Sequence, residues 1–330
     1  MKLVYLLQWA SDPIAKIATN HPDVKFVRAA DQSHAAREVV DADVLLVGGP
    51  LYVGEVAAAV NDSAPNLRWI QSSSIGTDKF LEGGVPPHVI FTNSAGLKGS
   101  SVAEHGIALL LGHLRALPKI VKLQSNHTWG RDTLRGAVSS LEGRTALLVG
   151  YGSIGSELAR KAKAFDMHVI ALNRSGSGGP PADEVRHIGE LDHVLPRADV
   201  VMVSLPLSKE TVHLLGPKQF AAMKQSAVLL NVGRGPVVDQ QAMKQALLHE
   251  QIAAACLDVF DEEPLPADDE LWSMPNVIIS PHVAGTGGPI YERFAQLVDQ
   301  NLQRLQNGAR LINLVDIENS GYVPRLAKRL

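Results

Sequence analysis

The fold of this protein is decided by residues 145–155, which read TALLVGYGSIG. An apolar, β-forming run leads directly into the pattern G-x-G-x-x-G, and a stretch of helix length, residues 154–165, follows. A strand, a glycine-rich turn and a helix in this order are typical of the turn that binds dinucleotide phosphates. Gly150 would permit the tight turn, Gly152 would let the backbone approach a pyrophosphate, and Gly155 would allow close packing of helix on strand.

The N-terminus of this helix would present free N–H groups and the positive end of its dipole to the phosphates, with Ser153 and Ile154 as candidate cofactor contacts. Alone the motif is weak, because glycine-rich turns between strand and helix also occur for purely structural reasons. Its setting therefore matters more than the motif.

That setting is a regular series of apolar runs of strand length. They comprise residues 145–149, 168–172, 200–204, 228–231, 254–258 and 277–280. Segments of helix length, such as 154–165 and 240–249, lie between them. Strand and helix in repeated alternation predict a doubly wound parallel sheet in an α/β fold.

The first hundred residues show a shorter version of the same alternation. Strands are expected at residues 2–7, 24–27, 44–47, 69–71 and 89–91. They indicate a second parallel α/β unit. Between the two series a helix is expected from about residue 100, where Ser101 and Glu104 have capping-box spacing, to the region limited by Pro118. Residues 175–181 are expected to form a surface loop, because they are rich in Gly, Ser and Pro.

Residues suited to binding and catalysis follow each strand of the longer series. Ligands of open parallel sheets bind beyond the carboxyl ends of the strands. In strand order the residues found there are Gly150, Gly152 and Gly155; Asn173, Arg174 and Ser175; Leu205, Pro206 and Thr211; Val232, Gly233 and Arg234; Asp258 and Glu263; and His282. Their convergence on one edge predicts a cofactor and catalytic site there.

The residues after the second strand of this series indicate the cofactor. An NAD site usually carries Asp or Glu about 20 residues past the glycine motif, bonded to the ribose 2′-OH. Residues 172–175 read LNRS, without an acid. The forked guanidinium of Arg174 and the hydroxyl of Ser175 suit a 2′-phosphate, so the sequence predicts NADP. In the alternative interpretation Arg174 is a solvated loop arginine, and NAD binds as well.

Three longer stretches resemble the D-isomer-specific 2-hydroxyacid dehydrogenase family, which includes glyoxylate/hydroxypyruvate reductases and phosphoglycerate dehydrogenase. They are residues 230–239 (LNVGRGPVVD), 257–264 (LDVFDEEP) and 275–282 (PNVIISPH), and the similarity runs from residues 73–78 (SSIGTD) to about residue 301. The resemblance implies a Rossmann-type cofactor domain, residues 100–285, inserted into a smaller flavodoxin-like α/β substrate domain of residues 1–99 and 286–330. Residues 285–288 (GTGG) are the hinge candidate.

The resemblance also implies a catalytic trio of Arg234, Glu263 and His282 that reduces a small 2-keto acid to a D-2-hydroxy acid. Arg234 would bind the carboxylate and polarise the keto oxygen. His282 would donate the proton, because imidazole is the side chain that ordinarily titrates nearest neutrality. Glu263 would orient the imidazole and hold it protonated. Glu262 competes for this role, but Glu263 stands directly before Pro264, as the family pattern requires.

Weaker candidates rest on the same resemblance. The Ile75-Gly76 peptide corresponds to the loop whose N–H groups bind the substrate carboxylate, although a simple turn is an alternative. Leu51 and Tyr52 could contact the substrate side chain. Asp258 matches a position near the nicotinamide carboxamide, and it could equally be a structural acid at a strand end.

An expectation of quaternary structure comes from the resemblance too. The family is usually dimeric, which implies a homodimer, and the apolar helix of residues 102–117 is the expected contact. Trp129 is expected to serve packing rather than the site.

Composition narrows the classes of function. The 330 residues suffice for two domains, and 31 basic against 34 acidic side chains leave no excess for nucleic-acid binding. The single cysteine, Cys256, allows no intrachain disulfide and is expected to be a buried strand residue. Residues 2–7 are apolar but lack a cleavable small-residue site and are too short to span a bilayer. No His/Cys cluster has metal-ligand spacing. We therefore expect a cytoplasmic protein without a metal site or membrane partner.

Several alternatives stay open at this point. One is a nucleotide-sensing, corepressor-like protein without turnover, although the intact trio argues against it. Another is a different enzyme on the same scaffold, such as a formate dehydrogenase or a homocysteine-nucleoside hydrolase. The keto acid is also open between glyoxylate, hydroxypyruvate and bulkier aliphatic or aromatic acids. Residues 283–289 (VAGTGGP) depart from the commonest family pattern, which leaves the mouth of the substrate pocket open as well. Residues 321–324 could contact the substrate domain or a partner, or be solvated.

Overall fold

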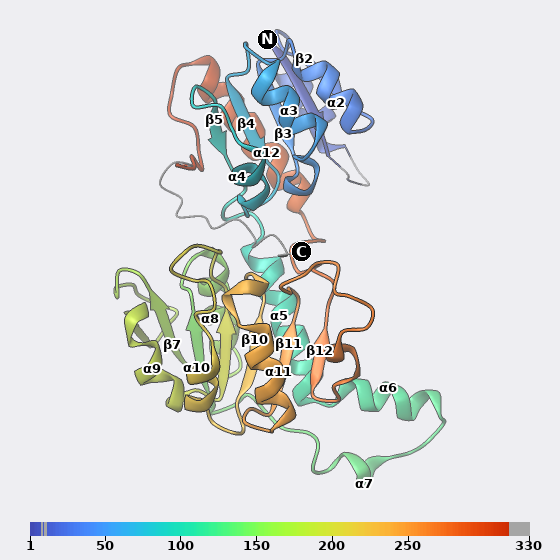
Figure 1. The fold of residues 1–330 in the computed structure, drawn as a ribbon, viewed down its shortest axis with the longest axis vertical. Coiled ribbons are helices and arrows are strands. Elements are labelled where there is room, and N and C mark those ends of the chain that lie inside the picture. Colours follow the sequence, from blue (N-terminus) through green and yellow to red (C-terminus); the bar gives the residue numbers. More distant parts are fainter. Residues whose placement is uncertain (8, 10–11, 317–330) are drawn as a thin grey trace, which may run out of the picture. The chain divides into compact units, whose positions relative to one another are not determined.

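A computed structural model of the chain describes residues 1–7, 9 and 12–316. The described residues form two compact units, shown in Figure 1. Met1–Lys98 and the described residues from Gly287 onward form the first unit, and Gly99–Thr286 form the second. Residues 321–324, for which we considered a contact role, lie outside the described residues.

The first unit is built on a parallel sheet with strand order β2-β1-β3-β4-β5. Its strands are β1 (Lys2–Leu6), β2 (Lys25–Arg28), β3 (Val44–Val47), β4 (Trp69–Ser72) and β5 (Ile90–Thr92). Its α-helices are α1 (Pro13–Ile17), α2 (Gln32–Val39), α3 (Glu55–Asp62), α4 (Asp78–Gly83) and α12 (Ile290–Gln306). The order 2-1-3-4-5 is that of flavodoxin-like folds, which confirms the expected architecture of this unit.

Helices cover both faces of this sheet because successive strand residues point to opposite sides. On β3, Leu45 belongs to the apolar cluster that includes side chains of α2, α3 and α4. Its neighbour Leu46 belongs to the cluster that includes Trp69 and, from α12, Phe294. Two buried faces explain why the strands read as continuous apolar runs.

The second unit contains a parallel sheet with strand order β12-β11-β10-β9-β6-β7-β8. Its strands are β6 (Thr145–Val149), β7 (His168–Asn173), β8 (Glu184–His187), β9 (Val200–Val203), β10 (Val228–Asn231), β11 (Ala254–Leu257) and β12 (Val277–Ile279). Its α-helices are α5 (Gly99–Leu114), α6 (Leu117–Ser125), α7 (Arg131–Leu134), α8 (Ser153–Lys163), α9 (Leu191–Val194), α10 (Pro217–Ala222) and α11 (Gln240–Leu248). The strand order reverses between β6 and β9, as in Rossmann-type sheets, and the expected doubly wound fold is confirmed.

Short 3-10 helices complete both units. They are η1 (Ala18–Asn20), η2 (Gly49–Leu51), η3 (Ile188–Glu190), η4 (Leu195–Arg197), η5 (Gly235–Val237) and η6 (Glu270–Ser273). No helix within the described residues has the length and apolarity needed to cross a bilayer.

Two local expectations were wrong. β8 was missed because its sequence, EVRH, is mostly polar, which an edge strand with a single neighbour tolerates. α5 begins at Gly99, so Ser101 lies inside the helix and cannot form the expected capping box with Glu104. A side chain at residue 99 is excluded, since a Cβ there would lie 2.7 Å from the carbonyl oxygen of Ser153 on α8.

The end of α5 also differs from the expectation. α5 ends at Leu114, and Ala116 turns the chain through a left-handed conformation with φ of 53°. Pro118 then lies in the first turn of α6, where a missing N–H costs nothing. As Figure 1 shows, α6 and α7 extend away from the body of this unit.

The other local expectations hold. Residues 174–181 form a mostly exposed loop, and Cys256 is fully buried in β11. Burial raises the pKa of the Cys256 thiol to about 12, so it is not a nucleophile near neutral pH.

Candidate active site

The glycine-rich turn between β6 and α8 has the geometry that dinucleotide binding requires. Gly150 has φ of 109°, a conformation that side chains rarely adopt, and a Cβ at Gly155 would lie 2.1 Å from the Gly150 carbonyl oxygen. A Cβ at Gly152, in contrast, would meet no described atom within 4 Å. No side chain caps the N-terminus of α8, which begins at Ser153. The turn therefore fits a phosphate group, which would accept hydrogen bonds from the first N–H groups of α8, including that of Ile154.

The turn that carries Arg234 is fixed by the buried residue Asn231 at the end of β10. The Asn231 side chain accepts a hydrogen bond from the Gly233 N–H (3.0 Å) and donates one to the Arg234 carbonyl (3.2 Å). Arg234 is half-buried, and its Nη1 donates to the Gly233 carbonyl (2.8 Å). We did not identify Asn231 from the sequence, although an amide at a strand end just before a glycine turn is a recognisable signal.

The loop after β11 packs directly against this turn. A Cβ at Gly235 would lie 2.0 Å from the carbonyl carbon of Phe260, so only glycine fits. This close approach brings the backbone next to Arg234 against the segment that leads to Glu263.

Glu263 and His282 are in direct contact. His282 Nδ1 lies 2.8 Å from Glu263 Oε2, while Glu263 Oε1 accepts a hydrogen bond from the Phe260 N–H (3.0 Å). The exposed fractions of the two side chains are 48% for His282 and 22% for Glu263. Because Nδ1 faces Glu263, the half-exposed ring presents Nε2 as the atom that can exchange a proton.

Asp258, at the end of β11, anchors the segment around His282. Its buried carboxylate accepts hydrogen bonds from Ser280 Oγ (2.6 Å), the Val283 N–H (3.0 Å) and the Ala284 N–H (3.0 Å). Asp258 thus has the structural role that we considered for it. Its contact with a nicotinamide stays a prediction.

The loop after β7 is organised around Asn173. Its side-chain oxygen accepts hydrogen bonds from the Ser175 N–H (3.1 Å), the Ser175 hydroxyl (3.1 Å) and the Gly176 N–H (2.8 Å). Arg174 lies exposed between Asn173 and Ser175. Asn173 therefore shapes the loop, and the guanidinium is the group that it offers to a ligand.

The loop after β9 lies close to Arg174. Thr211 Oγ1 closes this loop by donating to the Pro206 carbonyl (2.8 Å) and accepting from the Ser208 N–H (2.7 Å). A hydrogen bond from Ser208 lowers the pKa of Glu210, and the charges of nearby cations, Arg174 among them, lower it further. The loops after β7 and β9 thus share one edge of the sheet.

Leu205 lies between the two glycine turns. A Cβ at Gly150 would lie 3.0 Å from the Leu205 side chain, and a Cβ at Gly233 would lie 2.9 Å from the Leu205 carbonyl oxygen. Val232 is buried, and its N–H donates to the Val203 carbonyl (3.1 Å). The ends of β6, β9 and β10 therefore converge as the sequence predicted.

Known proteins are similar to this chain in sequence and fold. Residues 107–284 match the family model described as D-isomer specific 2-hydroxyacid dehydrogenase, NAD binding domain. A glyoxylate reductase of Thermofilum pendens is 33% identical over 289 residues, which cover 86% of this chain and 84% of the relative. The chain belongs to the D-isomer specific 2-hydroxyacid dehydrogenase family.

Solved structures of the family agree with this assignment. A D-isomer specific 2-hydroxyacid dehydrogenase family protein from Aeromonas salmonicida has a TM-score of 0.86 at 32% identity, covering 96% of this chain and 99% of its own. An NADPH-dependent glyoxylate/hydroxypyruvate reductase from Sinorhizobium meliloti, solved with NADP and sulfate, has a TM-score of 0.82 at 25% identity, covering 97% and 99%.

In this dehydrogenase the expectation that the Tyr52 side chain contacts the substrate is wrong. Its side chain is fully buried in the first unit, stacks on Phe80 at a centroid distance of 4.5 Å, and donates to the Gly84 carbonyl (2.6 Å). Burial raises the pKa of its hydroxyl. Tyr52 is a core residue, because the 3-10 turn η2 directs it inward.

The other candidates of the first unit lie at the carboxyl ends of its strands. Leu51 is half-buried and lines a cavity of about 650 Å³ together with residues such as Arg28 and Gln32. Ile75 and Gly76 are half-buried in the turn after β4, where the Ile75 carbonyl accepts from Asn93 Nδ2 (2.9 Å). Their contact with a substrate stays a prediction.

The expected packing role of Trp129 is wrong for the single chain. Its exposed fraction is 93%, on the connection between α6 and α7. It makes no contribution to the trio's site in this unit.

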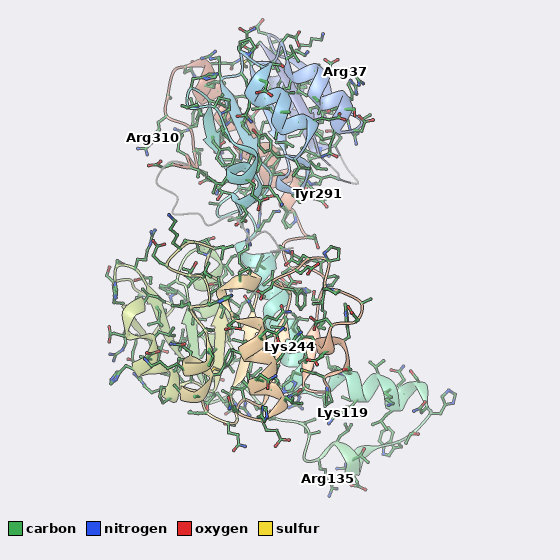
Figure 2. The ribbon with its side chains drawn as sticks, viewed as in Figure 1. Arg37, Lys119, Arg135, Lys244, Tyr291 and Arg310 are labelled. Carbon is green, nitrogen blue, oxygen red and sulfur yellow. The ribbon has the colours of Figure 1, made fainter. Side chains whose placement is uncertain are left out.

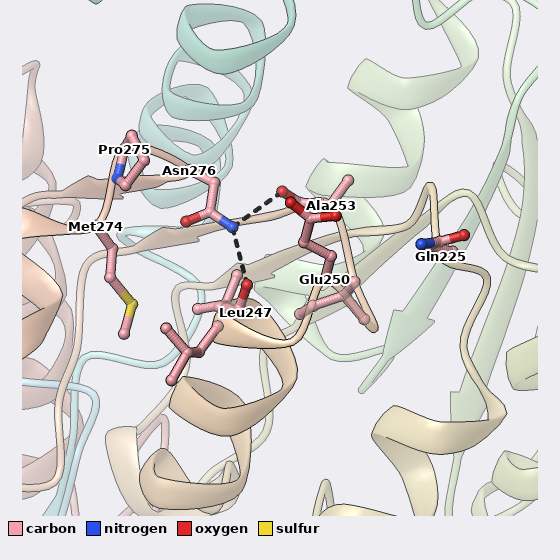
Figure 3. Close-up of a pocket in the computed structure, with 9 residues that line it drawn as sticks. Gln225, Leu247, Glu250, Ala253, Met274, Pro275 and Asn276 are labelled. Atoms are coloured by element: carbon pink, nitrogen blue, oxygen red, sulfur yellow. Dashed lines mark hydrogen bonds between the residues drawn. The ribbon is translucent and has the colours of Figure 1, made fainter.

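A cavity of about 480 Å³ lies at the other edge of the same sheet (Figure 3). It is lined by Gln225, Leu247, Leu248, Glu250, Ile252, Ala253, Met274, Pro275 and Asn276. These residues include those that directly precede β11 and β12, so the cavity is at the amino ends of the strands. It is therefore separate from the Arg234, Glu263 and His282 site.

Proposed function

We propose that this dehydrogenase reduces a small 2-keto acid to a D-2-hydroxy acid with NADPH. The observation that carries the proposal is the 2.8 Å contact between His282 Nδ1 and Glu263 Oε2 beside the Arg234 turn. An orienting carboxylate, a proton donor and an anion-binding guanidinium are what a 2-keto acid reduction requires from side chains.

Each member of the trio has a separate task. Arg234 binds the substrate carboxylate with its forked N–H donors and polarises the keto oxygen. A nicotinamide cofactor held at the glycine-rich turn between β6 and α8 would supply the hydride that the carbonyl carbon accepts. His282 gives the proton on Nε2 to the developing alkoxide oxygen and becomes neutral. Glu263 faces Nδ1 of the ring at 2.8 Å and holds the ring in place throughout.

We infer the preference for NADP from the loop after β7. The exposed guanidinium of Arg174 and the lack of an acid in residues 172–175 favour a 2′-phosphate over a bare ribose hydroxyl. The Sinorhizobium meliloti relative, which was solved with NADP, supports this inference. NAD is the second candidate cofactor.

A panel of 2-keto acids tests the activity. Oxidation of NADPH and of NADH is followed with glyoxylate, hydroxypyruvate and bulkier aliphatic and aromatic acids. We expect turnover with at least one acid and a higher kcat/KM with NADPH. Tight binding of NADPH without turnover on any acid would favour the nucleotide-sensing alternative. The contact between His282 and Glu263 argues against that alternative, because a sensor needs no proton donor.

Two arginine variants test the cofactor preference. Arg174→Ala should raise KM for NADPH by about tenfold or more and leave KM for NADH nearly unchanged, because a charge-assisted bond to phosphate is lost. Arg160→Ala is the matched control, since Arg160 is an exposed arginine that pairs with Glu157 on α8. Equal KM values for NADPH and NADH in the unmodified enzyme would contradict the preference.

We further propose a homodimer, but through a different contact from the one expected. Val102, Ile107 and Leu110 of α5 are buried in the core of their own unit, so this helix does not offer its apolar face. Exposed apolar side chains lie instead on the extension formed by α6 and α7, where Val121 is 58% exposed and Trp129 is 93% exposed.

The extension combines this apolar surface with exposed cations. Figure 2 shows the exposed residues Lys119, in the first turn of α6, and Arg135, at the end of α7. A second copy of the chain would cover the apolar residues. Light scattering should give a dimer mass, and Trp129→Asp should shift it toward a monomer; a monomer mass for the unmodified chain would refute the proposal.

We also propose a cytoplasmic location. The single cysteine is buried and can form no intrachain disulfide, which suits a reducing compartment. Fractionation of cells that express the tagged chain tests this, and recovery outside the cytoplasmic fraction would contradict it.

A further inference from the structure

A chain of three polar side chains joins α5 to the ends of β11 and β12. His105 Nε2 lies 2.7 Å from Ser280 Oγ, and Ser280 Oγ lies 2.6 Å from Asp258 Oδ1. His105 Nε2 is also 3.4 Å from Asp258 Oδ1. Because β11 and β12 are neighbouring parallel strands, Asp258 and Ser280 follow paired residues of the sheet.

The direction of the hydrogen bonds in this chain can be assigned. A carboxylate only accepts, so the Ser280 hydroxyl donates its proton to Asp258. The Ser280 oxygen must then accept from His105, which requires a proton on His105 Nε2. The chain thus runs from His105 through Ser280 to Asp258.

Asp258 in turn holds the backbone on both sides of His282. Ser280 precedes His282, and the N–H groups of Val283 and Ala284, which follow it, donate to the Asp258 carboxylate at 3.0 Å each. His282 itself has φ of 54°, in the left-handed region. A non-glycine residue stays in that region only when its surroundings over-determine it.

We propose that His105 and Ser280 are positioning residues for His282. They fix the Asp258 carboxylate, the carboxylate fixes the segment from Ser280 to Ala284, and this segment presents the imidazole to Glu263. The proposal rests on the proposed function for its kinetic part. None of the three side chains needs to touch the substrate for this role.

Paired variants separate positioning from packing. Ser280→Ala and His105→Phe each remove a hydrogen-bonding group and keep most of the side-chain volume. We expect each to lower kcat about tenfold, because the His282 imidazole would be misplaced. KM for NADPH should stay within about twofold, because the change lies in the proton-transfer step. Ser280→Thr and His105→Gln retain the hydroxyl and an N–H donor and should restore most of kcat. His113→Phe, on the same helix, is the matched control and should keep the kcat of the unmodified enzyme.

Some kinetic results would overturn the proposal. An unchanged kcat in Ser280→Ala and His105→Phe would show that the network is only structural. A raised KM for NADPH with an unchanged kcat would show that Asp258 and its partners serve the cofactor instead.

Histidine NMR tests the same claim without turnover. Long-range 1H–15N spectra of the full chain should show that His105 carries its proton on Nε2. Ser280→Ala should shift the ring signals of His282. The control His113→Phe should leave these signals in place. A His105 protonated only on Nδ1, or His282 signals that ignore Ser280→Ala, would overturn the proposal. If no keto acid is reduced but the His282 signals respond as expected, the proposed function fails and the positioning network stands.

Discussion

His282 Nδ1 lies 2.8 Å from Oε2 of Glu263, and the other oxygen of the same carboxylate accepts from the backbone N–H of Phe260 at 3.0 Å. The carboxylate is therefore held by its own loop while it holds the imidazole. Without the hydrogen bond from the Phe260 N–H, the carboxylate could rotate together with the imidazole ring. Because this hydrogen bond fixes the carboxylate, Glu263 sets the orientation of His282.

Glu263→Gln should lower kcat by about two orders of magnitude, because an amide can keep the hydrogen bond to Nδ1 but lacks the negative charge that faces the proton-donating ring. Binding of NADPH, measured by fluorescence titration, should be unchanged. Glu262→Gln is the matched control, since Glu262 is the adjacent carboxylate, and it should retain full kcat. If Glu262→Gln were the more damaging variant, the assignment of the working carboxylate would be wrong.

Arg234→Lys should raise KM for the keto acid by about a hundredfold although the charge is kept. Lysine offers a point charge in place of a planar fork, and a lost charge-assisted hydrogen bond costs about 1.5–3 kcal/mol. Steady-state kinetics with the best keto acid of the panel measures the effect. A lysine variant with an unchanged KM would show that Arg234 does not bind the carboxylate.

The glycine turn offers a matched pair that separates folding from cofactor binding. In Gly155→Ala the new Cβ would lie 2.1 Å from the Gly150 carbonyl oxygen, so we expect a loss of stability of about 1–3 kcal/mol and a lower Tm. In Gly152→Ala the new Cβ meets no described atom within 4 Å, so Tm without cofactor should be unchanged while NADPH binds less tightly. Differential scanning fluorimetry with and without NADPH measures both. A Gly152→Ala variant that binds NADPH normally would show that the phosphates do not approach this turn.

Glu184 on β8 should make the stability of the second unit depend on pH. Hydrogen bonds from Arg197, then from Arg186 and His168, hold the pKa of Glu184 well below its usual range. A carboxyl group with a depressed folded-state pKa stabilises the fold above its unfolded pKa of about 4.3, and this contribution is lost as the pH falls toward the folded-state value. Glu184→Gln should therefore lower the free energy of unfolding at pH 7 and match the unmodified chain in strong acid.

Urea denaturation at several pH values measures this difference. Glu142→Gln, a change of an exposed carboxylate, is the control and should show little difference at any pH. A constant difference between Glu184→Gln and the unmodified chain across the acid range would contradict the prediction.

Much of the fold could be predicted because its determinants are local. A buried parallel strand such as residues 145–149 is recognised by its own apolar run. The turn after it is recognised by its glycines, of which Gly150 has a positive φ and Gly155 has no room for a Cβ. The rule that ligands bind at the carboxyl ends of parallel strands then brought Arg234, Glu263 and His282 together without coordinates.

The features that could not be predicted depend on tertiary packing, that is, on which face of a helix, strand or loop packs against which neighbouring element. Tyr52 and Trp129 are both large aromatic residues in loop regions, yet one is fully buried and the other is 93% exposed. β8 was missed because an edge strand needs few apolar residues. His105 carries no local signal, since its partner Ser280, just after β12, is 175 residues away in the sequence.

By itself, the sequence determined the two parallel sheets and the glycine-rich turn between β6 and α8, because strand formation and glycine turns depend on neighbouring residues. Its resemblance to the family led to the proposed trio of Arg234, Glu263 and His282. Only the tertiary structure decided which carboxylate oxygen meets His282, which aromatic residue is core, and how His105 and Ser280 reach Asp258. Those contacts join residues far apart in the chain, and their geometry exists only after the strands and helices have packed.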